Sequence, residues 1–221
     1  MGLMYNLGTS LARICFHTFA KWSVTGKEGI PPRGRLLVVA NHLSYADPPV
    51  VAASLTRRTW FLAKRGLFRG PIVSSVMRAW GAYPLDRNQR DVEAIRWILR
   101  TLDEEKAVTV FPEGTRSPSG IRQASRGVAF IAAKSQTPIL PIGITGTENI
   151  SSIYRVPFPF CRINVNIGQP FSLPIIEGKL DDALLNSLTD MIMSRIAILL
   201  PENYRGIYNS KPNSINSKEF I

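Results

Sequence analysis

Residues 36–47 read LLVVANHLSYAD, a stretch that joins an apolar run to a polar loop. The run at 36–40 is continuous rather than alternating, which is typical of a strand covered on both faces. Asp47 is followed by two prolines and by apolar residues to about residue 55. This pattern predicts a helix with Asp47 as its N-cap and Pro48 at its first position. The stretch therefore predicts a buried strand, a loop and a helix in that order.

Outward from this stretch, strand-like and helix-like segments alternate along the chain. Further strands are expected at 59–63, 82–85, 107–111, 138–145 and 162–168. Helices are expected at 67–80, 89–105, 126–135 and 181–200. Pro141, inside the segment 138–145, favours an edge position or a bulge for that strand. Alternation of this kind predicts an α/β fold with a mixed, partly parallel sheet flanked by helices.

The first 24 residues form an amphipathic segment of their own. The apolar residues that recur there at helical spacing include Leu3, Leu7, Leu11, Ile14 and Trp22. Arg13, His17 and Lys21 interrupt the apolar run, which makes it a poor signal peptide and too short an apolar stretch for a membrane-spanning helix. Two interpretations are open: a helix lying in a membrane interface, or a helix packed on the core.

The chain is expected to divide into three parts. Residues 1–24 are the helical segment, and residues 25–208 are the main domain. Residues 209–221 lack an apolar stripe and are expected to be disordered.

The composition restricts the class of protein. With 45% hydrophobic residues the chain can bury a core, which excludes a disordered protein. Lysine and arginine total 27 against 16 acidic residues, and the net charge of +11 requires an anionic partner or surface. Nucleic acid, anionic lipid and a phosphorylated substrate all fit. Cys15 and Cys161 lie far apart, which favours reduced thiols, and no cluster with the spacing of metal ligands occurs.

His42 is the first candidate catalytic residue, because it directly follows the buried strand at 36–40. Ligands of open α/β sheets bind beyond the carboxyl ends of the strands. The loop can fold the carboxylate of Asp47 onto the imidazole, where it would fix the tautomer and stabilise an imidazolium. The alternative is that Asp47 only caps its helix and that His42 is an exposed loop residue.

A second polar loop, FPEGTRS at 111–117, follows the buried strand at 107–111. If the two strands are parallel, both loops lie at the same edge of the sheet. Gly114 permits a sharp turn of the backbone, and Glu113 offers a carboxylate. The planar guanidinium of Arg116 suits a phosphate group.

Four blocks of the sequence together resemble the glycerolipid acyltransferases, the phospholipid and glycerol acyltransferase family typified by 1-acylglycerol-3-phosphate acyltransferase. In order, they are NHx4D at 41–47, GAYPLDR at 81–87, FPEGTRS at 111–117 and TPILPI at 137–142. The third block matches the family motif at every position. The resemblance covers about residues 25–170 and makes this family the leading hypothesis.

The resemblance implies the reaction and the role of each site residue. His42 would act as general base on the free hydroxyl of a lysophospholipid, most often 1-acyl-sn-glycerol 3-phosphate, with Asp47 orienting it. That oxygen would attack the thioester of acyl-CoA or acyl carrier protein directly, giving phosphatidic acid without an acyl-enzyme, a metal or a cofactor. The implied substrate-binding residues are Arg87, Glu113, Gly114, Thr115 and Arg116, and Lys64 is a further candidate for the phosphate.

The resemblance also implies a membrane partner. Basic residues lie among apolar ones at 57–80, as suits an anionic membrane surface. The protein is therefore expected to be peripheral or monotopic, on the cytoplasmic face. Three alternatives remain: an acyltransferase with a different acceptor, a serine hydrolase using Ser44 or Ser117, and a basic nucleic-acid-binding domain. Against the hydrolase, the sequence contains no GxSxG motif. Against a nucleic-acid-binding domain, that hypothesis does not account for the four ordered blocks.

Overall fold

A seven-stranded sheet forms the centre of the protein in a computed structural model that describes residues 2–85, 92–176 and 178–209. The strands are β1 (Lys21–Thr25), β2 (Leu36–Ala40), β3 (Thr59–Lys64), β4 (Ala82–Leu85), β5 (Ala107–Val110), β6 (Ile139–Thr145) and β7 (Arg162–Ile167). Their order is β1-β7-β6-β2-β5-β3-β4, and every neighbouring pair is parallel except β6 with β7. The prediction of a mixed, partly parallel α/β fold is confirmed.

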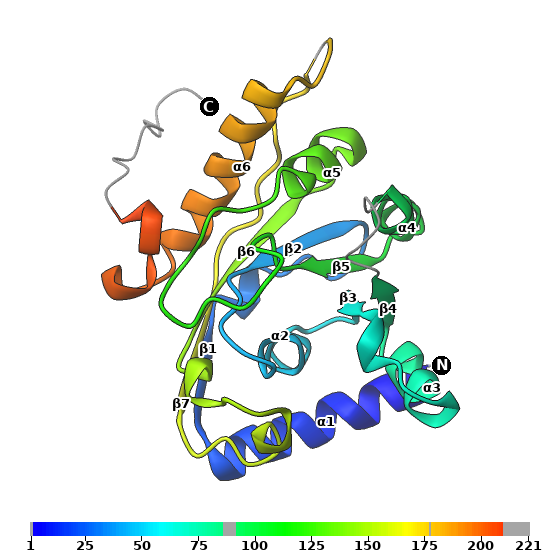
Figure 1. The fold of residues 1–221 in the computed structure, drawn as a ribbon, viewed down its shortest axis with the longest axis vertical. Helices are drawn as coiled ribbons and strands as arrows, with labels where there is room; N and C mark the ends of the chain where they lie inside the picture. Colours follow the sequence, from blue (N-terminus) through cyan, green and yellow to red (C-terminus); the bar gives the residue numbers. More distant parts are fainter. Residues whose placement is uncertain (1, 86–91, 177, 210–221) are drawn as a thin grey trace.

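Helices cover the sheet on both faces (Figure 1). They are α1 (Gly2–Phe19), α2 (Asp47–Ser54), α3 (Pro71–Ala79), α4 (Val92–Asp103), α5 (Gly127–Ser135) and α6 (Asp182–Ala197). α1 and α2 cover one face, α4, α5 and α6 cover the other, and α3 packs beside α1 and β4. The helix expected at 67–80 begins only at Pro71, after Gly70 in a positive-φ conformation. Residues 89–91 of the helix expected at 89–105 lie outside the described part of the chain.

The two layers explain the apolar run of β2. Leu36, Val38 and Ala40 belong to the core under α1 and α2, whereas Leu37 and Val39 belong to the core under α4, α5 and α6. All five side chains are fully buried. Burial of each large aliphatic side chain stabilises the folded state by about 1.5–3 kcal/mol. A strand that is covered on both faces is therefore apolar along its whole length.

The strand β6 lies inside the sheet, between β7 and β2, so the expectation of an edge position was wrong. The carbonyl of Pro141 accepts the N–H of Gly168, just past the end of β7 (2.9 Å). In a strand, the N–H and C=O of one residue point toward the same neighbour. Pro141 therefore omits only a terminal hydrogen bond toward β7, and its pairing with β2 is kept.

The N-terminal helix is shorter than the expected segment 1–24. α1 ends at Phe19, and residues 21–25 form the edge strand β1, because β7 offers them a free edge for parallel pairing. α1 packs on the core through the buried residues Tyr5, Thr9 and Phe16. Its opposite face is apolar yet exposed, and the exposed fraction is 72% at Leu3 and 62% at Leu11.

None of the helices in the described ranges has both the length and the apolar character needed to cross a membrane. The expected disordered tail, 209–221, lies outside the described residues except for Asn209.

Candidate active site

The two polar loops meet at one edge of the sheet, as expected from parallel strands. β2 and β5 are parallel neighbours, so the loops that follow them emerge side by side. Two hydrogen bonds join the loops: the N–H of His42 donates to Oε1 of Glu113 (2.9 Å), and the N–H of Ser117 donates to the carbonyl of His42 (2.7 Å). The backbone of His42 is therefore held on both sides by the second loop.

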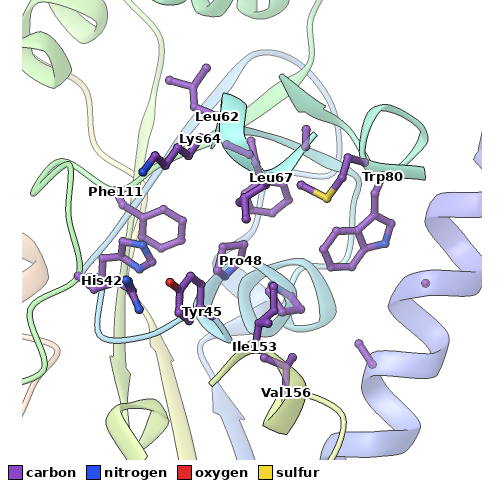
Figure 2. A pocket seen from close by; sticks show the side chains of 18 of the residues that line it. His42, Tyr45, Pro48, Leu62, Lys64, Leu67, Trp80, Phe111, Ile153 and Val156 are labelled. Atoms are coloured by element: carbon purple, nitrogen blue, oxygen red, sulfur yellow. The ribbon is translucent and has the colours of Figure 1, made fainter. Parts of the chain in front are cut away.

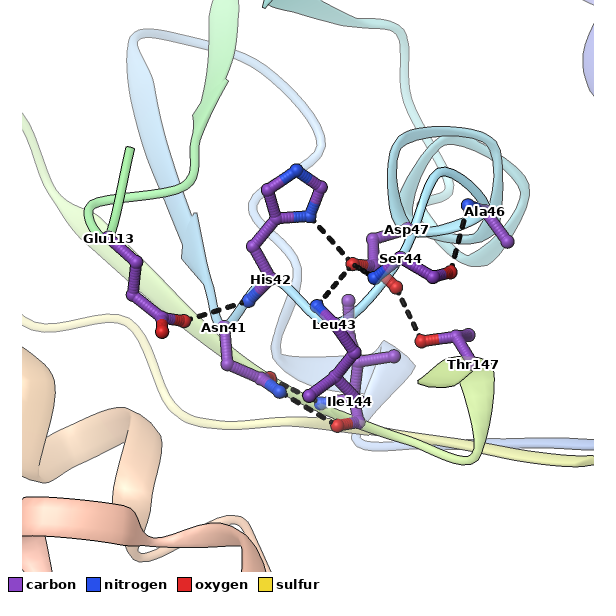
Figure 3. Close-up of polar contacts among 9 residues, drawn as sticks. All are labelled: Asn41, His42, Leu43, Ser44, Ala46, Asp47, Glu113, Ile144 and Thr147. Carbon is purple, nitrogen blue, oxygen red and sulfur yellow. Dashed lines mark hydrogen bonds and ion pairs between the residues drawn. The ribbon is translucent and has the colours of Figure 1, made fainter. Parts of the chain in front are cut away.

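The imidazole of His42 contacts the carboxylate of Asp47 (Figure 3). Its Nδ1 lies 2.7 Å from Oδ2, and the side chain of Asp47 is 0% exposed. Oδ2 also accepts the N–H groups of Leu43 (2.6 Å) and Ser44 (2.8 Å), and Oδ1 accepts the hydroxyl of Thr147 (2.5 Å). The N-cap prediction was wrong by one residue, because Ala46 is the N-cap and Asp47 begins α2. Its carboxylate turns back into the preceding loop, so the alternative of an isolated, exposed His42 is wrong as well.

These contacts define the tautomer of His42. Two backbone donors already point at Oδ2 of Asp47, and a hydroxyl points at Oδ1, as suits an ionised carboxylate that only accepts hydrogen bonds. The Nδ1 atom of His42 must then donate its proton to Oδ2. The lone pair is left on Nε2, on the opposite side of the ring, where it can accept a proton from a bound hydroxyl group.

Thr147 is a further residue of the site, and the sequence did not indicate it. It begins the short 3-10 helix η3 (Thr147–Asn149), which follows β6 at the same edge of the sheet. Gly146 makes the turn with φ +88°, and a Cβ there would lie 1.7 Å from the carbonyl oxygen of Arg162. The sequence did offer a signal, a polar residue shortly after a buried strand. The mistaken expectation that this strand lies at the edge of the sheet made that residue look remote from His42.

Asn41 has a structural role next to His42. Its side-chain amide donates to the carbonyl of Ile144 (2.9 Å) and accepts the N–H of the same residue (2.7 Å). The pair of bonds ties the end of β2 to β6. The loop that bears His42 therefore starts from a fixed position.

A pocket of about 720 Å³ opens beside His42 (Figure 2). Its polar end includes His42, Lys64, Thr115 and Arg116. Figure 2 shows Lys64 on the His42 side of the pocket and Trp80 at the other side. Much of the remaining wall is apolar and comes from α1, α2, β3, α3 and the segment 153–157. The ring of Phe111 stacks on the imidazole (centroids 4.4 Å apart, planes 26°) and continues the apolar wall up to the His42–Asp47 pair.

Three of the five candidate substrate-binding residues that the structure describes line the pocket. Lys64, Thr115 and Arg116 line the pocket, and the Arg116 guanidinium lies over the ring of Tyr45 (3.7 Å to the centroid). Gly114 makes the turn with φ +66°. Arg87 lies outside the described residues.

Glu113 is engaged by the backbone. Its Oε1 accepts the N–H of His42, and its Oε2 accepts the N–H of Arg122 (3.0 Å). Burial raises the pKa of Glu113, while the two N–H donors act in the opposite direction. Its carboxylate therefore positions His42 in this structure, and it does not line the pocket.

The two serines of the hydrolase alternative have local hydrogen bonds. The Oγ of Ser44 accepts the N–H of Ala46 (3.0 Å), and the hydroxyl of Ser117 donates to the carbonyl of Gly120. Both residues are buried. Neither is presented to His42 as an activated nucleophile would be.

Comparison with known proteins gives consistent matches. The family model described as acyltransferase matches residues 21–145. A 1-acyl-sn-glycerol-3-phosphate acyltransferase of Streptococcus pneumoniae is 26% identical over 203 residues, which cover 88% of this chain and 74% of that protein. The chloroplastic enzyme of the same name from Brassica napus is 32% identical over 143 residues, which cover 63% of this chain and 41% of that protein.

A solved structure is also similar. It is the crystal structure of the 1-acyl-sn-glycerophosphate acyltransferase PlsC from Thermotoga maritima, with a TM-score of 0.67 and 26% sequence identity. The match covers 85% of this chain and 76% of that one.

The substitution Glu113→Gln tests whether this carboxylate positions His42 or binds substrate. An amide presents one acceptor and one donor group, so one of the two backbone N–H groups loses its partner, at a cost of about 1.5–3 kcal/mol. We expect kcat to fall about tenfold with an unchanged KM for the acyl acceptor, as measured by steady-state kinetics on variant protein shown to be folded by circular dichroism. A rise in KM at constant kcat would show instead that Glu113 contacts the acceptor.

Proposed function

Because this chain belongs to the acyltransferase family, we propose that it transfers a fatty acyl group to the free hydroxyl of a lysophospholipid. The proposed acceptor is 1-acyl-sn-glycerol 3-phosphate, and the product is phosphatidic acid for phospholipid synthesis. One observation carries the proposal: the His42–Asp47 pair lies at the polar end of a largely apolar pocket. The names of the relatives support the choice of acceptor.

The proposed chemistry is a direct transfer. Nε2 of His42 accepts the proton of the acceptor hydroxyl. At the same time the oxygen of that hydroxyl attacks the thioester carbonyl and forms the new ester bond. The carbon–sulfur bond then breaks, and the thiol leaves with the proton held by the imidazolium. Asp47 stabilises that imidazolium through Nδ1. A positioned base accelerates such a step by about 10²–10⁴-fold, and holding both substrates together supplies much of the remainder.

The pocket suits both ends of a lysophospholipid. Arg116 and Lys64 carry positive charge at the His42 end, where they can bind a phosphate by charge-assisted hydrogen bonds. Gly114 and Thr115 shape the same loop, and we include Arg87 by family resemblance. The apolar walls can hold an acyl chain, and a pocket of this size is within the usual range of about 300–1,000 Å³ for small-molecule sites. Either acyl-CoA or acyl carrier protein can supply the thioester, and the scheme uses no metal or other cofactor.

Exposed apolar residues lie on α1, on α3 and in the segment 153–160, three parts of the chain that also line the pocket, and we name this set the apolar rim. Its members are Leu3, Met4, Leu7, Leu11 and Ile14 on α1, Ile72, Val73 and Val76 on α3, and Ile153, Tyr154, Phe158 and Phe160 in the segment 153–160. Phe19, in the last turn of α1, packs against this segment. Its ring makes edge-to-face contacts with the rings of Phe158 and Phe160, with centroids 5.0 Å and 5.6 Å apart. Tyr154 is 88% exposed. Figure 1 shows α3 near one end of α1 and the segment 153–160 near the other.

Exposed large apolar side chains gathered on neighbouring elements are typical of a surface that contacts a membrane or a protein partner. Basic residues near it, such as Arg69 and Arg78, add about 1 kcal/mol each at an anionic membrane. We therefore propose a peripheral or monotopic association with the cytoplasmic face of a membrane. This placement lets an acyl chain pass between bilayer and pocket. The same lipid and phosphate chemistry explains the excess of basic residues without a nucleic-acid partner.

The activity is tested by thiol release from acyl-CoA or acyl carrier protein, with and without lysophosphatidate. We expect thiol release that requires the acceptor, and the thioester that supports it identifies the donor. The rate of release should fall at least about 10²-fold in His42→Ala, since the base is lost. A monoacylglycerol without phosphate is the control acceptor and should support slower release. Release in the absence of acceptor would contradict the proposal and indicate a hydrolase.

The membrane association is tested by sedimentation with vesicles of phosphatidylcholine and phosphatidylglycerol. We expect the variant Leu3→Ser, Leu7→Ser, Ile14→Ser to bind at least tenfold more weakly, because these side chains are exposed and do not line the pocket.

The matched control for this test is Ile175→Ser with Ile198→Ser, which removes exposed apolar residues outside the apolar rim. The control should bind vesicles as the wild type does. Equal partitioning of the wild type and the α1 variant would contradict docking through α1.

A further inference from the structure

We propose that Tyr204, in the segment 201–208 that we name the C-terminal segment, is a positioning residue for the His42–Asp47 pair. The segment contains the 3-10 helices η5 (Glu202–Tyr204) and η6 (Gly206–Tyr208). Tyr204 does not line the pocket and is far from His42 in the sequence. It acts through two separate chains of contacts, one from its side chain and one from its backbone. The inference rests on the proposed function, because it concerns the geometry of the same base.

The first chain runs from the hydroxyl of Tyr204 to Asp47. This hydroxyl donates to Oε1 of Glu148 (2.6 Å), and Glu148 is the middle residue of η3. The preceding residue in η3 is Thr147, whose hydroxyl donates to Oδ1 of Asp47. Tyr204 therefore anchors the short helix that supplies one of the donors to the buried carboxylate.

The contact between Tyr204 and Glu148 is partly buried. The Oε2 atom of Glu148 is buried and lacks a hydrogen-bond partner among the described residues, so the carboxylate depends on the tyrosine hydroxyl bound to Oε1. Burial and the contact with Glu148 raise the pKa of Tyr204 to about 12. Tyr204 thus remains a neutral donor at physiological pH.

The second chain runs from the backbone of Tyr204 to the N–H of His42. The carbonyl of Tyr204 accepts the N–H of Ile121 (3.0 Å). The next residue, Arg122, donates its N–H to Oε2 of Glu113, and Oε1 of Glu113 accepts the N–H of His42. Together the two chains close a ring of contacts around the catalytic pair.

A close backbone approach fixes the C-terminal segment on this loop. The N–H of Ile207 donates to the carbonyl of Ile121 (3.3 Å). Gly206 adopts φ +50°, and a Cβ there would lie 2.1 Å from the same carbonyl oxygen. Only glycine fits this contact, so the C-terminal segment is seated on the loop that carries Arg122.

The substitution Tyr204→Phe removes the hydroxyl group and with it the first chain of contacts. It keeps the aromatic ring and the backbone contacts of residue 204. We expect kcat to fall about tenfold, because small misplacements of a catalytic group are costly, while KM for acceptor and donor stays unchanged. A purely structural role would lower thermal stability without this separation of kcat from KM. Thermal unfolding by circular dichroism reports whether the variant is folded at the assay temperature.

Two sets of controls make the test specific. Tyr208→Phe removes another tyrosine hydroxyl from the C-terminal segment, one that donates to Asp190 of α6 (2.9 Å), and it should keep wild-type kcat. Glu148→Gln keeps an acceptor for Tyr204 and should stay within about twofold of wild type, whereas Glu148→Ala should match Tyr204→Phe.

The proposal is overturned if folded Tyr204→Phe keeps wild-type kcat, if its KM rises in place of the fall in kcat, or if Tyr208→Phe loses as much activity. Failure of the proposed function gives a different result. In that case the wild type itself shows no acceptor-dependent thiol release. The kcat comparison is therefore made only against an active wild type.

Discussion

The buried carboxylate of Asp47 is the constraint on which the site depends. An ionised carboxylate removed from water costs several kcal/mol unless hydrogen bonds replace the lost hydration. Asp47 meets this cost with donors from the loop backbone, from the imidazole and from Thr147. Each of these bonds to a charged group contributes about 1.5–3 kcal/mol. The loop 42–47, the start of α2 and the turn after β6 must therefore keep their relative positions.

The sheet makes this arrangement possible, because β5, β2 and β6 are parallel neighbours and end at one edge. The loop after β2 supplies His42, the loop after β5 supplies Glu113 and Arg116, and the turn after β6 supplies Thr147. α1 and α3 then extend the apolar wall away from that edge. The proposed proton transfer and the proposed binding of an acyl chain thus occupy two ends of one pocket. The apolar rim lies on elements that also line this pocket, so the proposed reaction and the proposed membrane contact share these elements.

Local patterns predicted much of this, and contacts distant in the sequence explain the rest. The continuous apolar runs of β2 and β5 placed His42 and the FPEGTRS loop together on the condition that the two strands are parallel, and the structure shows that they are. The position of Thr147 depends on β6 lying inside the sheet. Pro141 indicated an edge strand instead, but the sheet tolerates this proline in an inner strand because the hydrogen bond it omits is a terminal one. The engagement of Glu113 by the backbone of Arg122 could not be predicted, since an exposed loop sequence does not indicate which N–H groups its carboxylate will meet. Whether residues 21–25 form a helix or a strand depends on the free edge of β7.

The site requires that Nδ1 of His42 donates to Asp47 and that Nε2 is free to accept a proton. Nitrogen-15 NMR of the imidazole groups at neutral pH tests this most directly. The chain has two histidines, so a His17→Gln variant leaves the signals of His42 alone. We expect a protonated Nδ1 with a strongly downfield proton and an unprotonated Nε2, and both features should be lost in Asp47→Asn. A proton on Nε2 with a bare Nδ1 in the wild type would contradict it.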